Sequence, residues 1–178
     1  MKKILLMVVA AMMATMNVNA QEEYNNEISI AYGAGSNTDL VMSIAKGMFT
    51  GKQLDYWGPI SVEYFGRLNS NNRLGIGGIF AVSGCKWDDT GDAKSQYYTI
   101  MPAIKYNWSV KKYVSWYSKG AIGMTIASQS AGRDDKTDLQ FNFQASLLGV
   151  EFGGAFRGFV ELGFGEQGIA LAGLRYKF

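Results

Sequence analysis

Apolar and polar residues alternate with a period of two along eight separate stretches of this 178-residue chain. The stretch "LQFNFQASL" shows the pattern most cleanly, with Leu139, Phe141 and Phe143 on one side and Gln140 and Asn142 on the other. The other seven stretches span residues 27–33, 59–68, 73–83, 97–108, 113–127, 156–165 and 170–178. This alternation is typical of β-strands whose two faces meet different surroundings. We therefore predict an all-β domain of eight antiparallel strands in up-and-down order.

The connections between these strands alternate in length. "NSNN", "SVKK" and "EFGG" are tight turns, whereas "GCKWDDTGDAKSQ" and "SQSAGRDDKTD" are longer, polar and rich in Gly and Asp, as loops are. Within the first long connection, "NTDLVMSIAKGMFTG" repeats apolar residues at helical spacing and predicts a short helix. Pro102 lies inside a predicted strand and has no N–H for the ladder, so we expect a bulge or bend there.

The alternation fits two opposite proteins, which differ in the face that meets water. In a soluble lipocalin-like carrier the apolar face points inward around a ligand. In an outer-membrane barrel the apolar face meets lipid and the polar face lines the interior. The charged residues within the strands all lie on the face opposite the apolar one: Glu27, Glu63, Arg67, Lys105, Lys119, Arg157, Glu161, Arg175 and Lys177.

This partition favours lipid on the outside, because Lys or Arg at the bilayer midplane costs about 2–4 kcal/mol. The rest of the polar face is mostly small residues, which suit the narrow interior of an eight-stranded barrel. Aromatic residues gather near both predicted rims, as they do at the two membrane interfaces of such barrels: Trp108, Phe156, Tyr176 and Phe178 near one, and Tyr32, Trp57, Tyr98 and Phe164 near the other. We expect the last strand, ending at Phe178, to close the barrel against the first.

The first 20 residues have the composition of a secretory signal peptide. Lys2 and Lys3 precede an apolar run, and Val18-Asn19-Ala20 forms a small-residue cleavage site. We predict cleavage near Ala20, which gives a signal peptide of residues 1–20 and one barrel domain of residues 21–178. The mature domain carries equal numbers of acidic and basic residues, so its charge gives no reason to expect nucleic acid as a partner.

Together these features resemble the small outer-membrane β-barrels of Gram-negative bacteria, of the OmpX and OmpA transmembrane-domain type. "GPISVEYFGR", "IMPAIKYNW", "FNFQASLLG" and "FRGFVELGFGEQGIALAGLRYKF" are similar to an uncharacterised Bacteroidota branch of that family. The resemblance covers essentially the whole mature chain. It implies a location in the outer membrane, contact with outer-membrane lipid and lipopolysaccharide, and recognition of Tyr176 and Phe178 by the outer-membrane assembly machinery.

The chemistry that the chain can perform is restricted, because it contains no histidine. Ser-His and Asp-His catalysis are therefore excluded, and the commonest transition-metal ligand is missing. We predict no catalytic residues, no cofactor and no metal site. The acidic loops, with Asp88, Asp89, Asp92, Asp134, Asp135 and Asp138, do not have the spacing of an EF-hand and are read as solvated. Cys85 is the only cysteine, so no disulfide framework exists.

The interior charges need partners, because an unpaired buried charge costs several kcal/mol. We predict an interior salt-bridge cluster of Glu63, Glu161, Lys119 and Arg175, with Arg67, Lys105 and Arg157 nearer the periplasmic mouth. Such a cluster would fill the barrel. We therefore expect a non-enzymatic outer-membrane protein with a structural or surface-interaction role through its external loops. A narrow channel for small solutes or ions, a soluble carrier and a histidine-free lipid-modifying enzyme remain as alternatives.

Overall fold

The computed structural model describes residues 24–38, 54–68, 73–87, 94–111, 113–131 and 134–178. Eight antiparallel strands form a closed barrel in which each strand pairs with its neighbour in sequence and β8 pairs with β1. The strands are β1 (Asn26–Ala34), β2 (Leu54–Arg67), β3 (Leu74–Trp87), β4 (Lys94–Val110), β5 (Val114–Ala131), β6 (Asp134–Gly153), β7 (Phe156–Gly165) and β8 (Ala170–Lys177). Within the described residues no helix is both long enough and apolar enough to cross a bilayer.

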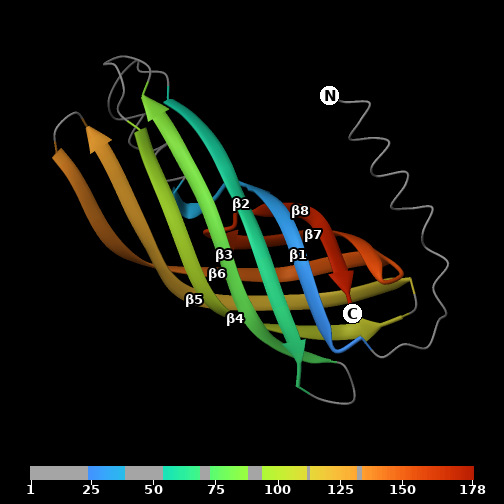
Figure 1. The fold of residues 1–178 in the computed structure, drawn as a ribbon. Coiled ribbons are helices and arrows are strands. Elements are labelled where there is room, and N and C mark those ends of the chain that lie inside the picture. Colours follow the sequence, from blue (N-terminus) through green and yellow to red (C-terminus); the bar gives the residue numbers. More distant parts are fainter. Residues whose placement is uncertain (1–23, 39–53, 69–72, 88–93, 112, 132–133) are drawn as a thin grey trace.

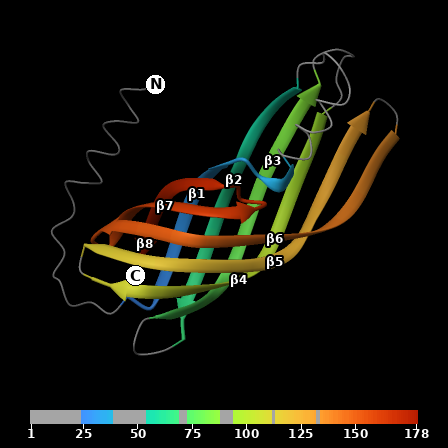
Figure 2. The ribbon, with the colours of Figure 1, turned by 180° about the vertical axis from the view of Figure 1, so that it is seen from behind.

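Strand length divides the barrel into two parts. β2 to β6 have 14 to 20 residues each, whereas β1, β7 and β8 have 8 to 10. Figures 1 and 2 show the long strands running well past the short ones at one end of the barrel. Asn26 and Phe178 lie together at the other end, joined by backbone hydrogen bonds, and we call it the terminal end.

The sequence prediction of eight alternating strands is confirmed, and so is the face that points outward. Ile60, Phe141 and Leu162 are exposed on the outside, with 73% of Phe141 accessible. Glu63 and Lys119 are buried in the interior. This is the partition of a barrel in lipid, and it is the reverse of what a soluble carrier with an apolar interior requires.

The outward aromatic residues lie near both ends of the barrel. Trp108, Tyr176 and Phe178 are exposed at the terminal end, where the last two stack with ring centroids 5.8 Å apart. Tyr98 and Phe164 are exposed toward the opposite end. Two aromatic zones with an apolar band between them are the pattern that barrels present to the two membrane interfaces.

Two of the predicted connections are shorter than expected, because strands continue into them. In "GCKWDDTGDAKSQ" β3 runs on to Trp87 and β4 begins at Lys94, and in "SQSAGRDDKTD" β5 runs on to Ala131 and β6 begins at Asp134. The turn predicted at "EFGG" is also shifted, because β6 continues to Gly153. The predicted signal peptide and residues 39–51, which make up most of the predicted helix, lie outside the described residues.

The bulge expected at Pro102 is absent. Pro102 pairs with Gly78 in an unbroken register, and the pairs on either side of it, Ile100 with Met124 and Ala103 with Ala121, keep the same register on β5. The register shifts instead at the chain's other proline, Pro59, between Trp57 and Ile60. The missing N–H of Pro102 is evident on the β5 side, where the ladder omits Met101 and Pro102 without a change of register.

A further bulge in β6 reverses the two faces of that strand. Between Ser146 and Gly149 the register shifts against both β5 and β7, and the neighbouring residues Leu147 and Leu148 both point outward. On one side of this bulge the buried residues are even-numbered, and on the other side they are odd-numbered. The bulge therefore turns Glu151 into the interior.

Candidate functional site

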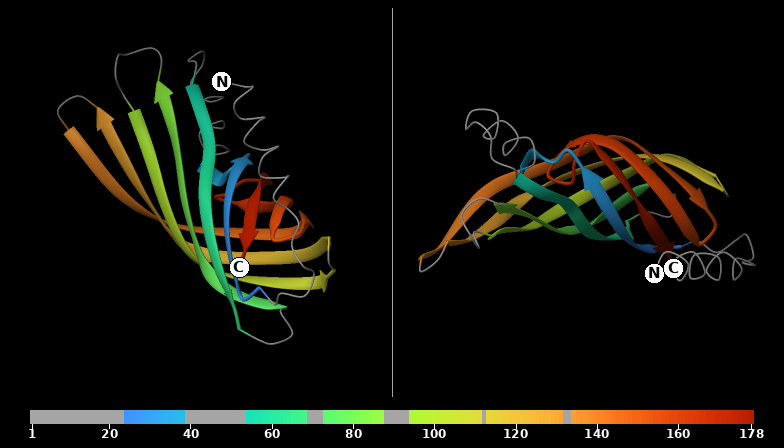
Figure 3. Two further views of the ribbon diagram at one scale, coloured as in Figure 1. Left: turned by 45° about the vertical axis from the view of Figure 1, so that its right-hand side comes forward. Right: turned by 90° about the horizontal axis from the view of Figure 1, so that it is seen from above.

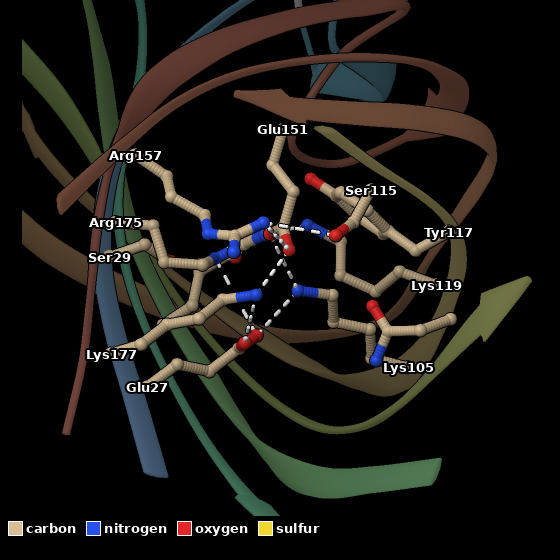
Figure 4. A network of polar contacts seen from close by, with 12 residues as sticks. Glu27, Ser29, Lys105, Ser115, Tyr117, Lys119, Glu151, Arg157, Arg175 and Lys177 are labelled. Carbon is tan, nitrogen blue, oxygen red and sulfur yellow. Dashed lines mark hydrogen bonds and ion pairs between the residues drawn. The ribbon is translucent and has the colours of Figure 1, made fainter. Parts of the chain in front are cut away.

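The barrel interior holds a network of buried charged side chains, drawn in Figure 4. Seven of the eight strands contribute a charged residue, because the inward parity of each strand points at the same narrow space. The charged members are Glu27 (β1), Glu63 and Arg67 (β2), Lys105 (β4), Lys119 (β5), Glu151 (β6), Arg157 and Glu161 (β7), and Arg175 and Lys177 (β8).

The tier farther from the terminal end is built around Lys119. Its Nζ lies 2.5 Å from Glu63 Oε1 and 2.8 Å from Glu161 Oε2. The Tyr117 hydroxyl donates a hydrogen bond of 2.6 Å to Glu161 Oε1, and Ser29 donates one of 3.0 Å to Glu63 Oε2. All of these side chains are buried, and the two carboxylates are compensated by ion pairs and hydrogen bonds.

The tier nearer the terminal end contains Glu27 and Glu151. Lys105 Nζ lies 2.6 Å from Glu27 Oε1 and 3.3 Å from Glu151 Oε2. Lys177 forms ion pairs with both carboxylates. Two arginines complete the tier, with Arg157 3.3 Å from Glu151 and Arg67 3.6 Å from Glu27.

Arg175 joins the two tiers. Its Nη1 lies 2.7 Å from Glu151 Oε2 and its Nη2 lies 3.1 Å from Glu63 Oε2. The guanidinium carbon lies 4.3 Å from the centroid of the Phe159 ring and 4.9 Å from that of Tyr117. A planar guanidinium can satisfy several carboxylates and lie over aromatic rings at once, which an ammonium group does less well. Arg175 is therefore the residue on which the network depends most.

The β7–β8 turn folds into the interior above these two tiers. Gln167 is fully buried, and its Nε2 donates hydrogen bonds of 2.8 Å to Ser61 Oγ and Glu63 Oε1. Its neighbour Glu166 accepts hydrogen bonds from Thr38 and Asn142. No residue of the described part forms an ion pair with Glu166, so this carboxyl differs from the four below it.

The structure brings the predicted interior residues together in this arrangement. Glu63, Glu161, Lys119 and Arg175 share contacts, and Arg67, Lys105 and Arg157 lie nearer the terminal end. The sequence interpretation missed Glu151, because it placed this residue in a turn. It also left out Tyr117 and Gln167, whose roles depend on cross-barrel contacts that parity alone does not reveal. Tyr176 and Phe178, predicted as an assembly signal, lie on the outer surface.

The network provides little scope for chemistry. Glu27, Glu63, Glu151 and Glu161 are each within ion-pair distance of a lysine or arginine. A carboxylate held in this way is a poor general acid or base, because its oxygens are engaged by its partners and its burial keeps substrate away. Among the described residues, no group of three His, Cys, Asp or Glu side chains is placed to hold a metal ion.

Comparison with solved structures supports the same architecture. The crystal structure of Ail, the attachment invasion locus protein of Yersinia pestis, aligns with 88% of this chain and 100% of its own, at 17% identity and a TM-score of 0.51. The chain has the fold of these eight-stranded outer-membrane barrels. Ail in complex with the heparin analogue sucrose octasulfate aligns over the same shares, at 16% identity and a TM-score of 0.53. No protein-family model and no curated protein sequence matches the chain.

Proposed function

We propose that this protein is a non-enzymatic integral outer-membrane barrel whose function is surface interaction. The membrane-embedded part is the closed barrel, with its outward apolar band and paired interior charges. The working part is the projecting sheet, which we define as the segments of β2 to β6 that run past the last residues paired with β1 or β7. These segments are bounded by Leu54–Trp57 on β2 and Asp134–Phe143 on β6.

The observation that carries this proposal is the difference in strand length. β1 reaches only Ile60 on β2, and β7 reaches only Gln144 on β6, while five strands continue as an open sheet (Figure 3). A barrel that only had to span the membrane would have no use for this extension. An open sheet with accessible edges suits contact with another molecule.

The orientation follows from the connections. Three short turns and both ends of the described barrel lie at the terminal end, which we assign to the periplasm. The projecting sheet then faces the outside of the cell. With this orientation the outward apolar side chains contact outer-membrane lipid and lipopolysaccharide. We further infer, from the family resemblance alone, that the outer-membrane assembly machinery recognises Tyr176 and Phe178.

The attachment role named for Ail is consistent with this proposal, although the two sequences share few residues. Ail has also been crystallised with a heparin analogue, so a sulfated glycan is a reasonable first probe. The interior network argues against the alternative of a channel, because paired side chains fill the lumen at two levels and the β7–β8 turn covers them. We expect no steady conductance from the reconstituted protein in planar bilayers.

Shortening one hairpin tests the proposal. Removing residues 128–137 and joining Ala127 to Asp138, which pair across β5 and β6, through an Asn-Gly turn leaves the barrel intact. Cells displaying the full-length chain should attach to heparin-coated surfaces, and cells displaying the shortened chain should attach less. Heat-modifiable migration in gels checks that both barrels fold. Equal attachment by both cell types would overturn the proposal.

A further inference from the structure

The terminal tier of the interior network carries more positive than negative charge. Within the described part of the barrel it contains four cations and two carboxylates: Arg67, Lys105, Arg157 and Lys177, with Glu27 and Glu151. The other tier is balanced once Arg175 is counted with it, because two cations then face Glu63 and Glu161. The described network therefore has a net charge of +2, and this excess lies toward the terminal end.

Three of the four cations lie at strand ends. Arg67 is the last residue of β2, Lys177 is the last residue of β8 and Arg157 is the second residue of β7, all at the terminal end. Lys105 lies farther inside, because β4 continues past it to Val110. We call Arg67, Arg157 and Lys177 the mouth triad. These residues are far apart in the chain, so only the closed barrel brings them together.

Two carboxylate oxygens hold the mouth triad together. Glu27 Oε2 lies 3.6 Å from Arg67 Nη2 and 3.7 Å from Lys177 Nζ. Glu151 Oε1 lies 3.3 Å from Arg157 Nη1 and also contacts Lys177 (Figure 4). Lys177 therefore links the two arginines, and three cations share two oxygens.

The other oxygen of each carboxylate is engaged deeper in the lumen. Lys105 lies 2.6 Å from Glu27 Oε1, and Arg175 lies 2.7 Å from Glu151 Oε2. The two carboxylates are thus divided between two levels of cations and do not balance the mouth triad by themselves. A guanidinium has five N–H donors and an ammonium has three, so the triad has more donors than the two oxygens accept.

The mouth triad is nearly buried, which strengthens its attraction for an anion. The side chains of Arg67, Arg157 and Lys177 are 5%, 6% and 2% exposed. Salt screens such charges much less than it screens charges on the surface. The two arginines retain the largest exposed fractions among the cations of the network, so an anion that enters from the terminal end meets them first.

We propose that the mouth triad binds one phosphate group at the terminal end of the lumen. A phosphate monoester carries a charge of about −1.5 to −2 at pH 7, which matches the excess of the tier, whereas a carboxylate would leave part of it. Two guanidinium forks also fit the oxygens of a phosphate. The group is either free phosphate or the headgroup of a lipid at the membrane interface. The site lies at the opposite end from the projecting sheet and does not depend on the proposed surface function.

Binding should stabilise the folded barrel. The unfolded chain has no such site, because the triad comes from three strands, and a ligand that binds only the folded state raises the free energy of unfolding. The test uses the full mature chain folded in dodecyl maltoside, a detergent without charge or phosphate. Inorganic phosphate at pH 7 should raise the urea midpoint relative to sodium chloride of equal ionic strength. Calorimetry should give a dissociation constant below about 1 mM.

A lipid arm separates the two sources of the phosphate group. The same protein is placed in maltoside micelles that contain phosphatidic acid, without free phosphate, and the control micelles contain diacylglycerol with the same acyl chains. A higher urea midpoint only with phosphatidic acid would support the site and assign it to a lipid headgroup. A higher midpoint with inorganic phosphate would support a site that also accepts the free ion.

A matched pair of variants separates the site from general charge attraction. Arg67→Gln removes one member of the triad and should weaken phosphate binding by about tenfold. Arg73→Gln removes the same charge from an exposed position before β3, at the same end of the barrel, and should have little effect. In the wild-type protein, phosphate should shift the Nε–H resonances of Arg67 and Arg157 in NMR spectra, but not that of Arg73.

Three results would overturn the inference. The first is an equal urea midpoint with and without phosphate in both the free-ion arm and the lipid arm. The second is an equal loss of affinity in Arg67→Gln and Arg73→Gln, which would indicate general charge attraction. The third is the absence of a shift at Arg67 and Arg157. The NMR measurement uses the wild-type protein, so it decides the question even if Arg67→Gln does not fold.

Discussion

Arg175 on β8 contacts Glu151 on β6 at 2.7 Å, although β7 separates the two strands in the sheet. The contact bridges over β7 on the inner face of the sheet, so it depends on the strong curvature of the barrel. The same guanidinium reaches Glu63 on β2. Stability of the barrel is therefore tied to cross-lumen ion pairs as well as to the ladders between neighbouring strands.

Replacement of Arg175 tests this dependence. Arg175→Met leaves Glu63 and Glu151 short of a cation inside the barrel, and breaking a buried pair in this way costs about 3–5 kcal/mol. We expect a loss of that size in the free energy of unfolding, measured by urea titration in lipid vesicles with tryptophan fluorescence. Arg157→Met is the control, because Arg157 lies at the periphery of the network and should cost less than half as much. Similar losses in the two variants would contradict the central role of Arg175.

The ion pair between Glu63 and Lys119 should show strong energetic coupling. Each single replacement, Glu63→Gln or Lys119→Met, leaves a buried charge without its nearest partner and should destabilise the barrel. The double variant should be more stable than the sum of the single losses predicts, with a coupling energy of about 1–3 kcal/mol. A cycle of four urea titrations measures it. Strict additivity would mean that the 2.5 Å contact contributes little.

The cost of placing a charge on the outward face should depend on how deep in the bilayer the position lies. Ile104 is 57% exposed on β4, between Tyr98 and Trp108 of the two aromatic zones, and Ile104→Arg should cost about 2–4 kcal/mol if hydrocarbon surrounds it. Val110 lies at the terminal end of β4, so Val110→Arg should cost only about 0–1 kcal/mol. Unfolding from vesicles measures both losses. Equal and small losses would show that water, and not lipid, covers this face.

Gly149 has a specific packing role beside Tyr117. A Cβ at Gly149 would lie 2.4 Å from the Tyr117 ring, which is the ring that Arg175 and Lys105 approach. Gly149→Ala should displace the ring and destabilise the barrel by about 1–3 kcal/mol. At Gly154 a Cβ meets nothing within 4 Å, so Gly154→Ala is the matched control and should have little effect on the urea midpoint.

Glu166 should make stability depend on pH. Burial raises the pKa of this carboxyl above its ordinary value of 4.5, and the hydrogen bonds from Thr38 and Asn142 only partly oppose the shift. The folded chain then holds the proton more tightly than the unfolded chain, so stability falls as pH rises from 4.5 through the folded pKa. Glu166→Gln, which cannot ionise, should remove this part of the decline. Urea midpoints at a series of pH values compare the two proteins.

The faces of the strands could be predicted from the sequence because their physical cause is local. Lipid excludes charge from one parity of every strand, and Glu63, Lys119, Glu161 and Arg175 all follow that rule without interruption. The ends of the strands could not be predicted as well. The polar residues around Lys94 and Asp134 are typical of loops in composition, but they form strands because neighbouring strands in the projecting sheet supply ladder partners.

Glu151 shows the other limit of sequence reasoning. Its inward position depends on one extra residue in β6, and nothing in "ASLLGVEFGG" distinguishes a bulge from the approach to a turn. Pro59 and Pro102 illustrate the same difficulty. Both lack an N–H, yet only Pro59 accompanies a register shift, and the sequence around the two prolines does not distinguish these outcomes.

The bulge between Ser146 and Gly149 makes the number of residues in β6 as important as their types, because this number decides which side chains point inward. Deleting Leu147 alone would change no charge, but it would bring both halves of β6 into one phase. Glu151 would stay in the lumen, because Ser146, Gly149 and Glu151 would then share one unbroken inward alternation. Deleting Val150, which follows the bulge, would instead turn Glu151 toward hydrocarbon and leave its lysine and arginine partners behind in the lumen.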